Sequence, residues 1–206
     1  MRITDIKKQR RSKKRFNIYV DGRYSFALSE IELINNKIEI GKDVDEFEIK
    51  SLKNKDEKSK ALNKALEIIS RRIHSEKEVR DKLRKKNFRS DVIDKSIENL
   101  KKIGYINDEI FAREWLESRI SYKPKGRALI KRELLYKGVN PEIMERVLEL
   151  VYNKDREKKE LERLYRERKK IIGKKHQEKD KLVRYLISRG FLWEDIKDTI
   201  ETENIN

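Results

Sequence analysis

The chain has few of the residues that cross-link a fold or interrupt a helix. Its 206 residues include no cysteine, two prolines, seven glycines and two histidines. The absence of cysteine excludes disulfides and thiolate metal sites. No apolar run is close to the length of about 18 residues that a membrane span needs. The basic N-terminus has no apolar stretch typical of a secretory signal. We expect a cytoplasmic protein with long helices, no membrane contact and no cofactor.

Charged residues take the place of the apolar material that a thick core would need. Hydrophobic residues make up 36% of the chain and charged residues 45%, whereas a typical globular domain is about 45–50% apolar and about 25% charged. This balance favours thin layers that each bury one apolar stripe. The net charge of +16 indicates a polyanionic partner, of which nucleic acid is the most common.

One apolar pattern occurs three times along the chain. Spacings of 4, 5, 5 and 4 residues recur, and the copies lie 51 and then 52 residues apart. The sets are Val79, Leu83, Phe88, Ile93 and Ile97, then Ile130, Leu134, Val139, Met144 and Leu148, then Leu182, Leu186, Phe191, Ile196 and Ile200. Such a repeat is typical of stacked helical modules. We expect a mainly α fold of three tandem three-helix modules that form an elongated curved body, with a small N-terminal β-hairpin region.

The pattern predicts four parts along the chain. They are an N-terminal basic β-hairpin region at 1–55 and modules one, two and three at 56–104, 105–152 and 153–206. In the first part, two runs rich in strand formers flank Asp21-Gly22, a dipeptide typical of a type I′ turn. The first helix of module one is expected to place Leu62, Leu66, Ile69 and Ile73 on its apolar stripe.

The spacing of five residues inside the pattern has a local cause. Asn87, Gly138 and Gly190 occupy matching positions, and Asn and Gly tolerate the left-handed conformation that follows a helix end. Counting back places a leucine at C3 and an apolar residue at C″, the two positions that touch in a Schellman motif. The pairs are Leu83 with Phe88, Leu134 with Val139, and Leu186 with Phe191. We expect the chain to turn at each of these positions.

Other residues are expected to support the ends of helices. Ser75 stands three residues before Glu78, which predicts a capping box at the start of a helix. Asp108 is expected to cap the first helix of module two, because its carboxylate can accept hydrogen bonds from unpaired N–H groups. Gly104 and Gly126 are interpreted as turn glycines.

Short phrases through modules one and two form a second kind of signal. They are Arg72-Ile-His-Ser75, Gly104-Tyr105-Ile-Asn-Asp108, Phe111-Ala112, Trp115, Arg119, Lys125-Gly126, Ile130 and Glu133–Val139. Together these phrases resemble the RecX family, closely over residues 62–150 and more weakly, but in register, over module three. We interpret the motif residues as mainly architectural, with Phe111 and Trp115 in the core.

The resemblance implies a tandem three-helix protein that modulates the bacterial recombinase RecA. It also implies binding in the helical groove of the RecA nucleoprotein filament, reduced ATP hydrolysis and strand exchange, and roles in homologous recombination, DNA repair and the SOS response. Some members of the family bind DNA directly. We expect a monomer that binds and inhibits the RecA filament, and that contacts single- and double-stranded DNA weakly and in a salt-dependent way.

Arg72 and three basic segments are the candidate contacts with RecA or DNA. Between Arg2 and Arg15 the chain has eight Lys or Arg residues and one acid. The candidates are Lys7, Lys8, Arg10, Arg11, Lys13 and Lys14 in the first segment, Lys123, Lys125, Arg127, Lys131 and Arg132 in the second, and Arg156, Lys159, Arg163, Arg166 and Lys170 in the third. The second segment surrounds a predicted helix start, where backbone amides favour anions. The sequence leaves open whether DNA phosphates or acidic patches on RecA meet these cations.

Two other classes of function are weighed against this interpretation. A helix-turn-helix regulator that binds DNA without RecA contact would need a recognition helix that reaches base edges. The third helix of each module is instead acidic at its N-terminal end. An enzyme such as a nuclease would need a catalytic metal site. The two histidines are scattered along the chain, and no carboxylates cluster on a common face. We therefore expect a non-enzymatic regulator.

Overall fold

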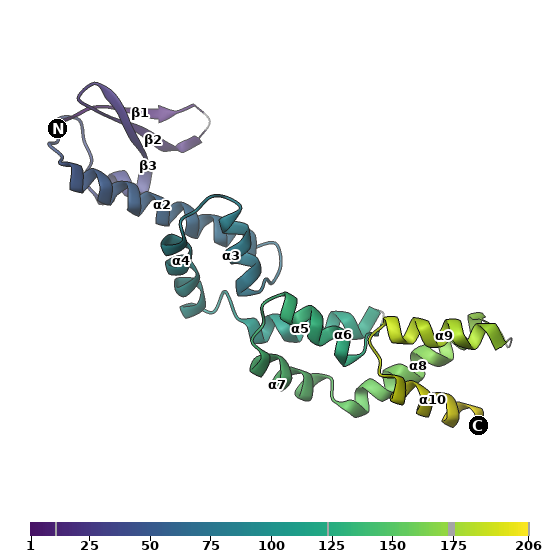
Figure 1. Cartoon of the computed structure of the whole chain (residues 1–206). Helices are drawn as coiled ribbons and strands as arrows, with labels where there is room; N and C mark the ends of the chain where they lie inside the picture. Colours follow the sequence, from purple (N-terminus) through teal and green to yellow (C-terminus); the bar gives the residue numbers. More distant parts are fainter. Residues whose placement is uncertain (11, 123, 173–175, 206) are drawn as a thin grey trace. The chain divides into compact units, whose positions relative to one another are not determined.

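The computed structural model describes residues 1–10, 12–122, 124–172 and 176–205. Within these residues a small sheet is followed by helices (Figure 1). The chain forms two compact units: unit 1 consists of Met1–Arg71 and Arg80–Lys102, and unit 2 of Arg72–Val79 and Ile103–Asn206. Among the described helices, none is both long and apolar enough to cross a membrane.

Unit 1 begins with a three-stranded antiparallel sheet in the order β1-β2-β3. The strands are β1 (Ile3–Gln9), β2 (Ser12–Val20) and β3 (Arg23–Ser29). The predicted hairpin of β2 and β3 is confirmed, and its turn residues Asp21 and Gly22 have φ angles of 48° and 79°. The sequence interpretation missed β1, because its two apolar residues, Ile3 and Ile6, are three residues apart. A register shift between Ile3 and Asp5 breaks the alternation typical of a strand.

The apolar face of the sheet packs on helices α1 (Glu30–Asn35) and α2 (Glu46–Ile69). Phe26 and Leu28 are buried in one cluster with Ile49 and Leu52 of α2, and the sheet lies on one side of that helix in Figure 1. Helix α2 runs without a break across residues 55 and 56, where the sequence pattern places the first domain boundary. The four domain ranges themselves stay predictions.

Helix α2 also packs against α4 (Ser90–Lys102). The residues of α3 (Glu76–Arg84) are divided between the two units. The buried residues in the second half of α2 are Ala61, Ala65 and Ile68. The predicted stripe was wrong by one residue: Leu62, Leu66 and Ile69 are only half-buried, and Ile73 lies beyond the end of α2 and is exposed. The two stripes differ by one step of about 100° around the helix. The small alanines face inward because they permit a close approach of the packed helix.

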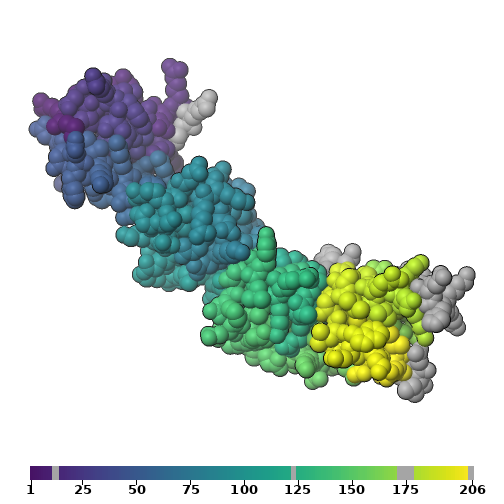
Figure 2. Space-filling view, in the orientation of Figure 1, coloured from purple at the N-terminus to yellow at the C-terminus, as the bar shows by residue number. Residues whose placement is uncertain are grey.

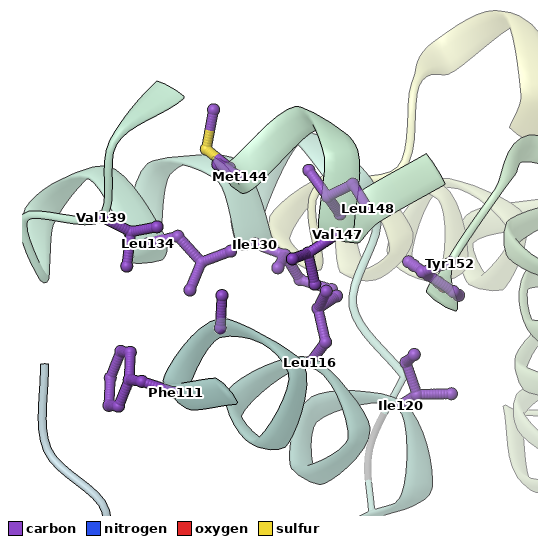
Figure 3. Packing of buried hydrophobic residues seen from close by; sticks show 11 residues of the cluster. Phe111, Leu116, Ile120, Ile130, Leu134, Val139, Met144, Val147, Leu148 and Tyr152 are labelled. Atoms are coloured by element: carbon purple, nitrogen blue, oxygen red, sulfur yellow. The ribbon is translucent and has the colours of Figure 1, made fainter. Parts of the chain in front are cut away.

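Unit 2 contains two three-helix clusters. The helices are α5 (Asp108–Tyr122), α6 (Arg127–Tyr136), α7 (Pro141–Val151), α8 (Lys154–Ile172), α9 (His176–Ser188) and α10 (Trp193–Ile205). Figure 3 shows the first cluster, in which Phe111 and Leu116 of α5 face Leu134 of α6 and Val147 of α7. Leu161, Leu186 and Ile196 belong to the second cluster. The atoms of the two clusters abut in Figure 2, coloured green and yellow.

All three predicted helix-ending turns are confirmed. Asn87, Gly138 and Gly190 have φ angles of 60°, 80° and 86°. In each turn the N–H of C″ donates to the carbonyl oxygen of C3, as a Schellman motif requires. The N···O distances are 3.4 Å for Phe88 to Leu83, 3.1 Å for Val139 to Leu134 and 3.3 Å for Phe191 to Leu186. Local backbone chemistry therefore produces the repeated spacing of five residues.

Gly126 has a different role from the one predicted. Its φ angle of −65° suits any residue, so the interpretation as a turn glycine was wrong. A Cβ atom on Gly126 would lie 2.1 Å from the carbonyl oxygen of Gly190. The N–H of Gly126 donates to the carbonyl oxygen of Arg189 at 2.9 Å. The missing side chain lets the start of α6 touch the turn after α9. Gly104, with a φ angle of 77° and open space around it, is confirmed as a turn glycine.

Candidate interaction surfaces

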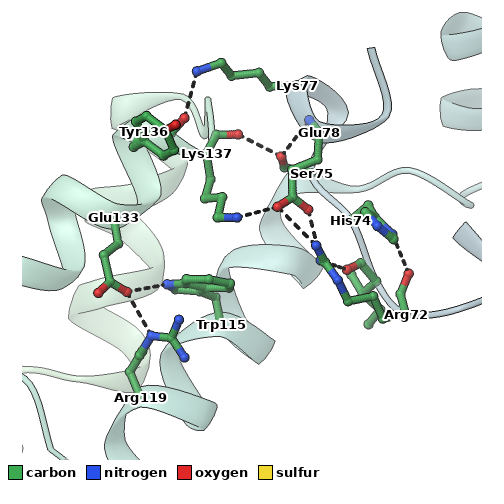
Figure 4. Close-up of polar contacts among 11 residues, drawn as sticks. Arg72, His74, Ser75, Lys77, Glu78, Trp115, Arg119, Glu133, Tyr136 and Lys137 are labelled. Atoms are coloured by element: carbon green, nitrogen blue, oxygen red, sulfur yellow. Dashed lines mark hydrogen bonds and ion pairs between the residues drawn. The ribbon is translucent and has the colours of Figure 1, made fainter. Parts of the chain in front are cut away.

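Arg72 belongs to a network of ion pairs at the start of α3 (Figure 4). The Glu78 carboxylate accepts hydrogen bonds from Arg72 at 2.9 Å and from the Lys137 ammonium. Burial alone would raise the pKa of Glu78, but these hydrogen bonds outweigh it and lower the pKa to about 2. Arg72 is half-exposed and holds an internal carboxylate, which limits its use in binding a partner.

The predicted capping box at Ser75 is present only in part. The Ser75 Oγ accepts the N–H of Glu78 at 3.2 Å, which confirms Ser75 as the cap, and donates its own hydrogen to the carbonyl oxygen of Lys137 at 2.7 Å. The Glu78 carboxylate instead binds Arg72 and Lys137 of the network above, where both partners of each hydrogen bond are charged. The capping residues therefore also join α3 to the end of α6.

Asp108 caps a helix other than the one predicted. Its carboxylate accepts the N–H of Glu76, at the start of α3, with a distance of 2.8 Å. The cap of α5 is Asn107, whose side-chain oxygen accepts the N–H groups of Glu109 and Ile110 at 2.9 and 3.1 Å. The assignment of Asp108 to α5 was wrong, because Asp108 is already the first residue of that helix.

Trp115 is held inside unit 2 by cations and a carboxylate. Its ring lies 3.9 Å from the guanidinium carbon of Arg119 and 4.8 Å from the Lys137 ammonium. Its indole N–H donates to Glu133 at 3.0 Å, and its ring stacks on buried Phe111. These contacts confirm the architectural interpretation of Phe111 and Trp115.

Most of the second basic segment is engaged within the protein. Lys125 donates to Glu133, Arg127 pairs with Glu149 at 3.2 Å, and Lys131 pairs with Glu145 at 2.6 Å. Burial favours a higher pKa for Glu133, but hydrogen bonds from Lys125, Arg119 and Trp115 outweigh it and lower that pKa. Arg132 is exposed and forms no ion pair with any residue that the structure describes. Residue 123 lies outside the described residues, so the placement of Lys123 stays a prediction.

The helix start in this segment already holds an anion. Glu157 of α8 is buried, and its carboxylate accepts the N–H of Arg127, the first residue of α6, at 2.7 Å. Burial raises the pKa of Glu157, and the negative charge of Asp195 acts in the same direction. The predicted attraction of the α6 N-terminus for anions is thus satisfied by the chain itself.

The third basic segment on α8 is divided between paired and unpaired cations. Arg156 pairs with Glu117 at 3.4 Å, Arg163 with Glu160 at 2.7 Å, and Arg166 with Glu203 at 2.7 Å. Lys159 and Lys170 are exposed, and neither forms an ion pair with a described residue. These two lysines are the members of the segment best placed to meet a partner.

The N-terminal segment forms the end of β1 and the start of β2. Lys8, Arg10 and Lys14 are exposed and form no ion pair with described residues, whereas Lys7 pairs with Asp5 at 2.8 Å. Residue 11 and the side chain of residue 13 lie outside the described part, so the contacts of Arg11 and Lys13 stay predictions.

Arg15 ends the first basic segment and Tyr19 follows it in β2, whereas Tyr24 was not singled out from the sequence. Arg15 pairs at 2.9 Å with the buried Asp56 and is structural. Tyr19 lies opposite Tyr24 across β2 and β3. The Asp21-Gly22 turn could have indicated this pairing, because such a turn determines the register of the hairpin.

The described residues contain no group of His, Asp or Glu side chains arranged to hold a metal ion. A pocket of about 310 Å³ lies between the starts of α6, α8 and α10. Arg127, Lys131, Lys154 and Lys158 line it together with Glu157, Glu194 and Asp195. Because cations and acids share its walls, the pocket favours no ligand of one charge.

Three family models match the chain. They are described as regulatory protein RecX N-terminal domain at residues 1–45, RecX first three-helix domain at 61–100 and RecX second three-helix domain at 107–148. Regulatory protein RecX of Clostridium tetani is 34% identical over 97% of this chain and 93% of its own length. Regulatory protein RecX of Listeria monocytogenes is 35% identical over 93% of this chain and 71% of its own length.

Two solved structures share the fold. A crystal structure of regulatory protein RecX matches with a TM-score of 0.71 at 24% identity, over 96% of this chain and 98% of the other. The crystal structure of RecX from Lactobacillus salivarius matches with a TM-score of 0.65 at 26% identity, over 73% of this chain and 99% of the other. At 24% identity, the first of these likenesses supports the fold alone.

Proposed function

The chain belongs to the RecX family, and on this premise we propose that it binds the RecA nucleoprotein filament and inhibits ATP hydrolysis and strand exchange. Its relatives are named regulatory proteins, and in this proposal the chain regulates recombination and DNA repair in the cytoplasm without catalysing a reaction. The chain acts as a monomer that binds RecA and, weakly, single- and double-stranded DNA.

The observation that carries the proposal is a set of exposed cations left over after internal pairing. The described acids hold many Lys and Arg side chains in place, yet six of the candidate cations are exposed and form no ion pair with described residues. They are Lys8, Arg10, Lys14, Arg132, Lys159 and Lys170. A surface of this kind is complementary to the phosphates of a nucleoprotein filament and to acidic patches on its protein.

The helix-turn-helix alternative is disfavoured by charge at the helix starts. The first turns of α4, α7 and α10 carry Asp91, Glu142, and Glu194 with Asp195. These acids would face phosphates if the helices entered a major groove. A footprint at one defined sequence that survives competitor DNA would support that alternative over ours.

The first test is a titration of DNA-dependent ATP hydrolysis by RecA. We expect the protein to reduce hydrolysis at less than one molecule per RecA, because each molecule contacts neighbouring subunits of the filament in this proposal. Unchanged hydrolysis at equimolar protein, with DNA and RecA in their usual complex, would exclude inhibition as the function.

A second test locates the contact. Replacing Arg132, Lys159 and Lys170 by Ala removes three exposed charges that no described acid holds, so folding is preserved. Lys125 and Arg127 are unsuitable for this test, because both bind carboxylates inside unit 2. We expect the triple variant to need several-fold more protein for half-inhibition.

The matched control removes the same charge from exposed lysines outside the basic segments. Lys85, Lys86 and Lys95 meet this requirement. Equal effects of the two triple variants would show that net charge, rather than the proposed surface, determines inhibition. A triple variant that inhibits like the unmodified protein would place the contact elsewhere.

A further inference from the structure

The sheet of unit 1 has two faces of different character. The inner face carries Ile18, Phe26 and Leu28, which are buried against the helices. The register places Asp5, Tyr19 and Tyr24 side by side on the other face, in β1, β2 and β3. This outer face carries no buried apolar cluster, although tyrosine is a residue that sheets commonly bury.

Tyr24 presents an aromatic ring to solvent on this outer face. It is 58% exposed, and its ring centroid lies 6.1 Å from that of Tyr19 with an interplanar angle of 77°. The Lys7 ammonium lies 5.0 Å from the centroid of the Tyr19 ring. Tyr19 is therefore covered by a cation and supports Tyr24 edge-on, while the ring of Tyr24 remains accessible.

Polar and charged groups of both signs surround the exposed ring: Asp21 lines the same hollow as Tyr24, and Lys7 is paired with Asp5 at 2.8 Å. Gln9 donates to the side chain of Asn17 at 2.7 Å, and Asn17 pairs with Lys7 in the register of the outer face. Arg23 is exposed and, with Tyr24, lines a surface hollow of about 400 Å³. Residues 1–29 contain nine Lys or Arg residues and two acids, a net charge of +7.

From this arrangement we infer that the outer face of the sheet is a stacking platform for single-stranded DNA, with a base on Tyr24 and the sugar-phosphate backbone on the surrounding cations. Proteins that bind single strands combine a positive surface with exposed aromatic rings. Bases inside a duplex are stacked on one another and cannot reach such a ring, which favours a single strand. The inference deepens the DNA binding included in the proposed function and rests on it.

Fluorescence anisotropy with a labelled oligo(dT) of about 15 nucleotides, the upper range for one such site, tests the inference on the full chain. Tyr24→Ala should weaken binding by about 5- to 150-fold, the value of one base–aromatic stack. Tyr24→Phe keeps the ring and should bind within about twofold of the unmodified protein. The control is Tyr105→Ala, since Tyr105 is 61% exposed and lies outside the sheet.

A second probe separates stacking from charge. An abasic oligonucleotide of the same length has the same phosphates and no bases, so it should bind more weakly than oligo(dT) and be insensitive to Tyr24→Ala. Three results would each overturn the inference. The first is equal affinity of the protein for the two probes, and the second is equal affinity of Tyr24→Ala and the unmodified protein for oligo(dT). The third is no measurable binding of oligo(dT) at low salt. Circular dichroism of Tyr24→Ala verifies that the sheet is retained.

The two proposals fail separately. If oligo(dT) binding depends on Tyr24 but RecA hydrolysis is unchanged, the stacking platform stands and inhibition of RecA is excluded. If hydrolysis is reduced and Tyr24→Ala binds oligo(dT) as tightly as the unmodified protein, the platform is excluded and regulation of RecA stands.

Discussion

Single glutamates in unit 2 bind several donors at once. Glu133 accepts hydrogen bonds from Lys125, Arg119 and Trp115. Glu78 binds Arg72 and Lys137 in the same way. Such acids stabilise the contacts between helices and withdraw their cations from the exposed surface. At the scale of residues, the acids therefore decide which Lys and Arg side chains can meet a partner.

Replacing Glu78 by Gln should remove a pH-dependent part of the stability. The pKa of Glu78 is lowered from 4.5 to about 2 in the folded protein, so its contribution is fully present above pH 4.5 and is lost as the pH falls toward 2. We expect Glu78→Gln to lower the free energy of unfolding by about 1–2 kcal/mol at pH 7, allowing for solvent screening. The difference from the unmodified protein should vanish near pH 2.

Urea unfolding at pH 7 and pH 3 measures this difference. The control is Glu98→Gln, which breaks an exposed pair with Lys102 on α4. Because both side chains of this pair are exposed, its loss should leave the free energy of unfolding nearly unchanged. A pH-independent difference for Glu78→Gln would contradict the assigned ionisation.

Tyr152 contains a buried hydroxyl with no hydrogen-bond partner among the described residues. Burial raises the pKa of this hydroxyl, so it remains neutral. Because an unsatisfied buried polar group costs about 1–3 kcal/mol, Tyr152→Phe should increase the free energy of unfolding, by about 1 kcal/mol. A thermal melt compares it with Tyr185→Phe, which loses a hydroxyl that Arg189 contacts at 3.2 Å and should not be stabilised. A destabilised Tyr152→Phe would indicate that the hydroxyl has a partner.

At the scale of elements, the repeated turns show how local and tertiary requirements act on the same residues. Asn87, Gly138 and Gly190 all adopt positive φ angles. Gly190 is also constrained from outside its turn, since a Cβ there would lie 2.3 Å from the Cβ of Leu129. Gly126 has a negative φ angle, so it is constrained only by the space around its Cα. Glycine is thus needed at some positions for conformation and at others for space.

Gly126→Ala separates the two requirements. Its φ angle allows alanine, so any loss comes from the contact with Gly190. We expect a loss of about 1–3 kcal/mol in the free energy of unfolding, the usual cost of overpacking. Chemical denaturation followed by circular dichroism measures it.

Gly104→Ala is the complementary variant, because Gly104 has a positive φ angle and no atoms near the position of an added Cβ. Its cost should be about 1–2 kcal/mol, from backbone strain alone. If Gly126→Ala were as stable as the unmodified protein, the close approach of α6 to the turn after α9 would be disproved.

At the scale of the whole molecule, the count of 54 Lys and Arg residues overstates the number of cations available to an anion. Many candidate cations are paired within their unit, and the curved, elongated body that the repeat predicts stays a prediction. DNA affinity should therefore depend on salt less steeply than the number of basic residues indicates.

The slope of log K against log salt tests this for duplex DNA. Each neutralised phosphate contributes about −0.9, so the six unpaired candidates would give a slope of about −5. The slope would reach about −8 if Arg11, Lys13 and Lys123 also contact phosphates. A slope well beyond −8 would mean that cations outside the candidate set also contact phosphates. Binding isotherms at several salt concentrations provide the measurement.

Local sequence determined the features that depend on a few neighbouring residues. The Asp21-Gly22 turn, the Schellman turns and the cap at Ser75 were predicted correctly, because each depends on backbone conformation within about six residues. The motif phrases likewise identified the family. Features that depend on residues far apart in the chain were predicted less well. Asp108 caps α3 rather than α5, and the buried stripe of α2 is shifted by one residue from the predicted one.

Only the tertiary structure decided which charges remain available. Arg127 and Lys159 are equivalent in sequence terms, as basic residues on amphipathic helices. Arg127 meets Glu149, whereas Lys159 meets no described acid. Ion pairing depends on distances between residues that are often tens of positions apart, as Arg127 and Glu149 are, and the order of residues along the chain does not specify those distances. The sequence therefore determined the repeated architecture, and the packing of one helix against another determined its accessible surface.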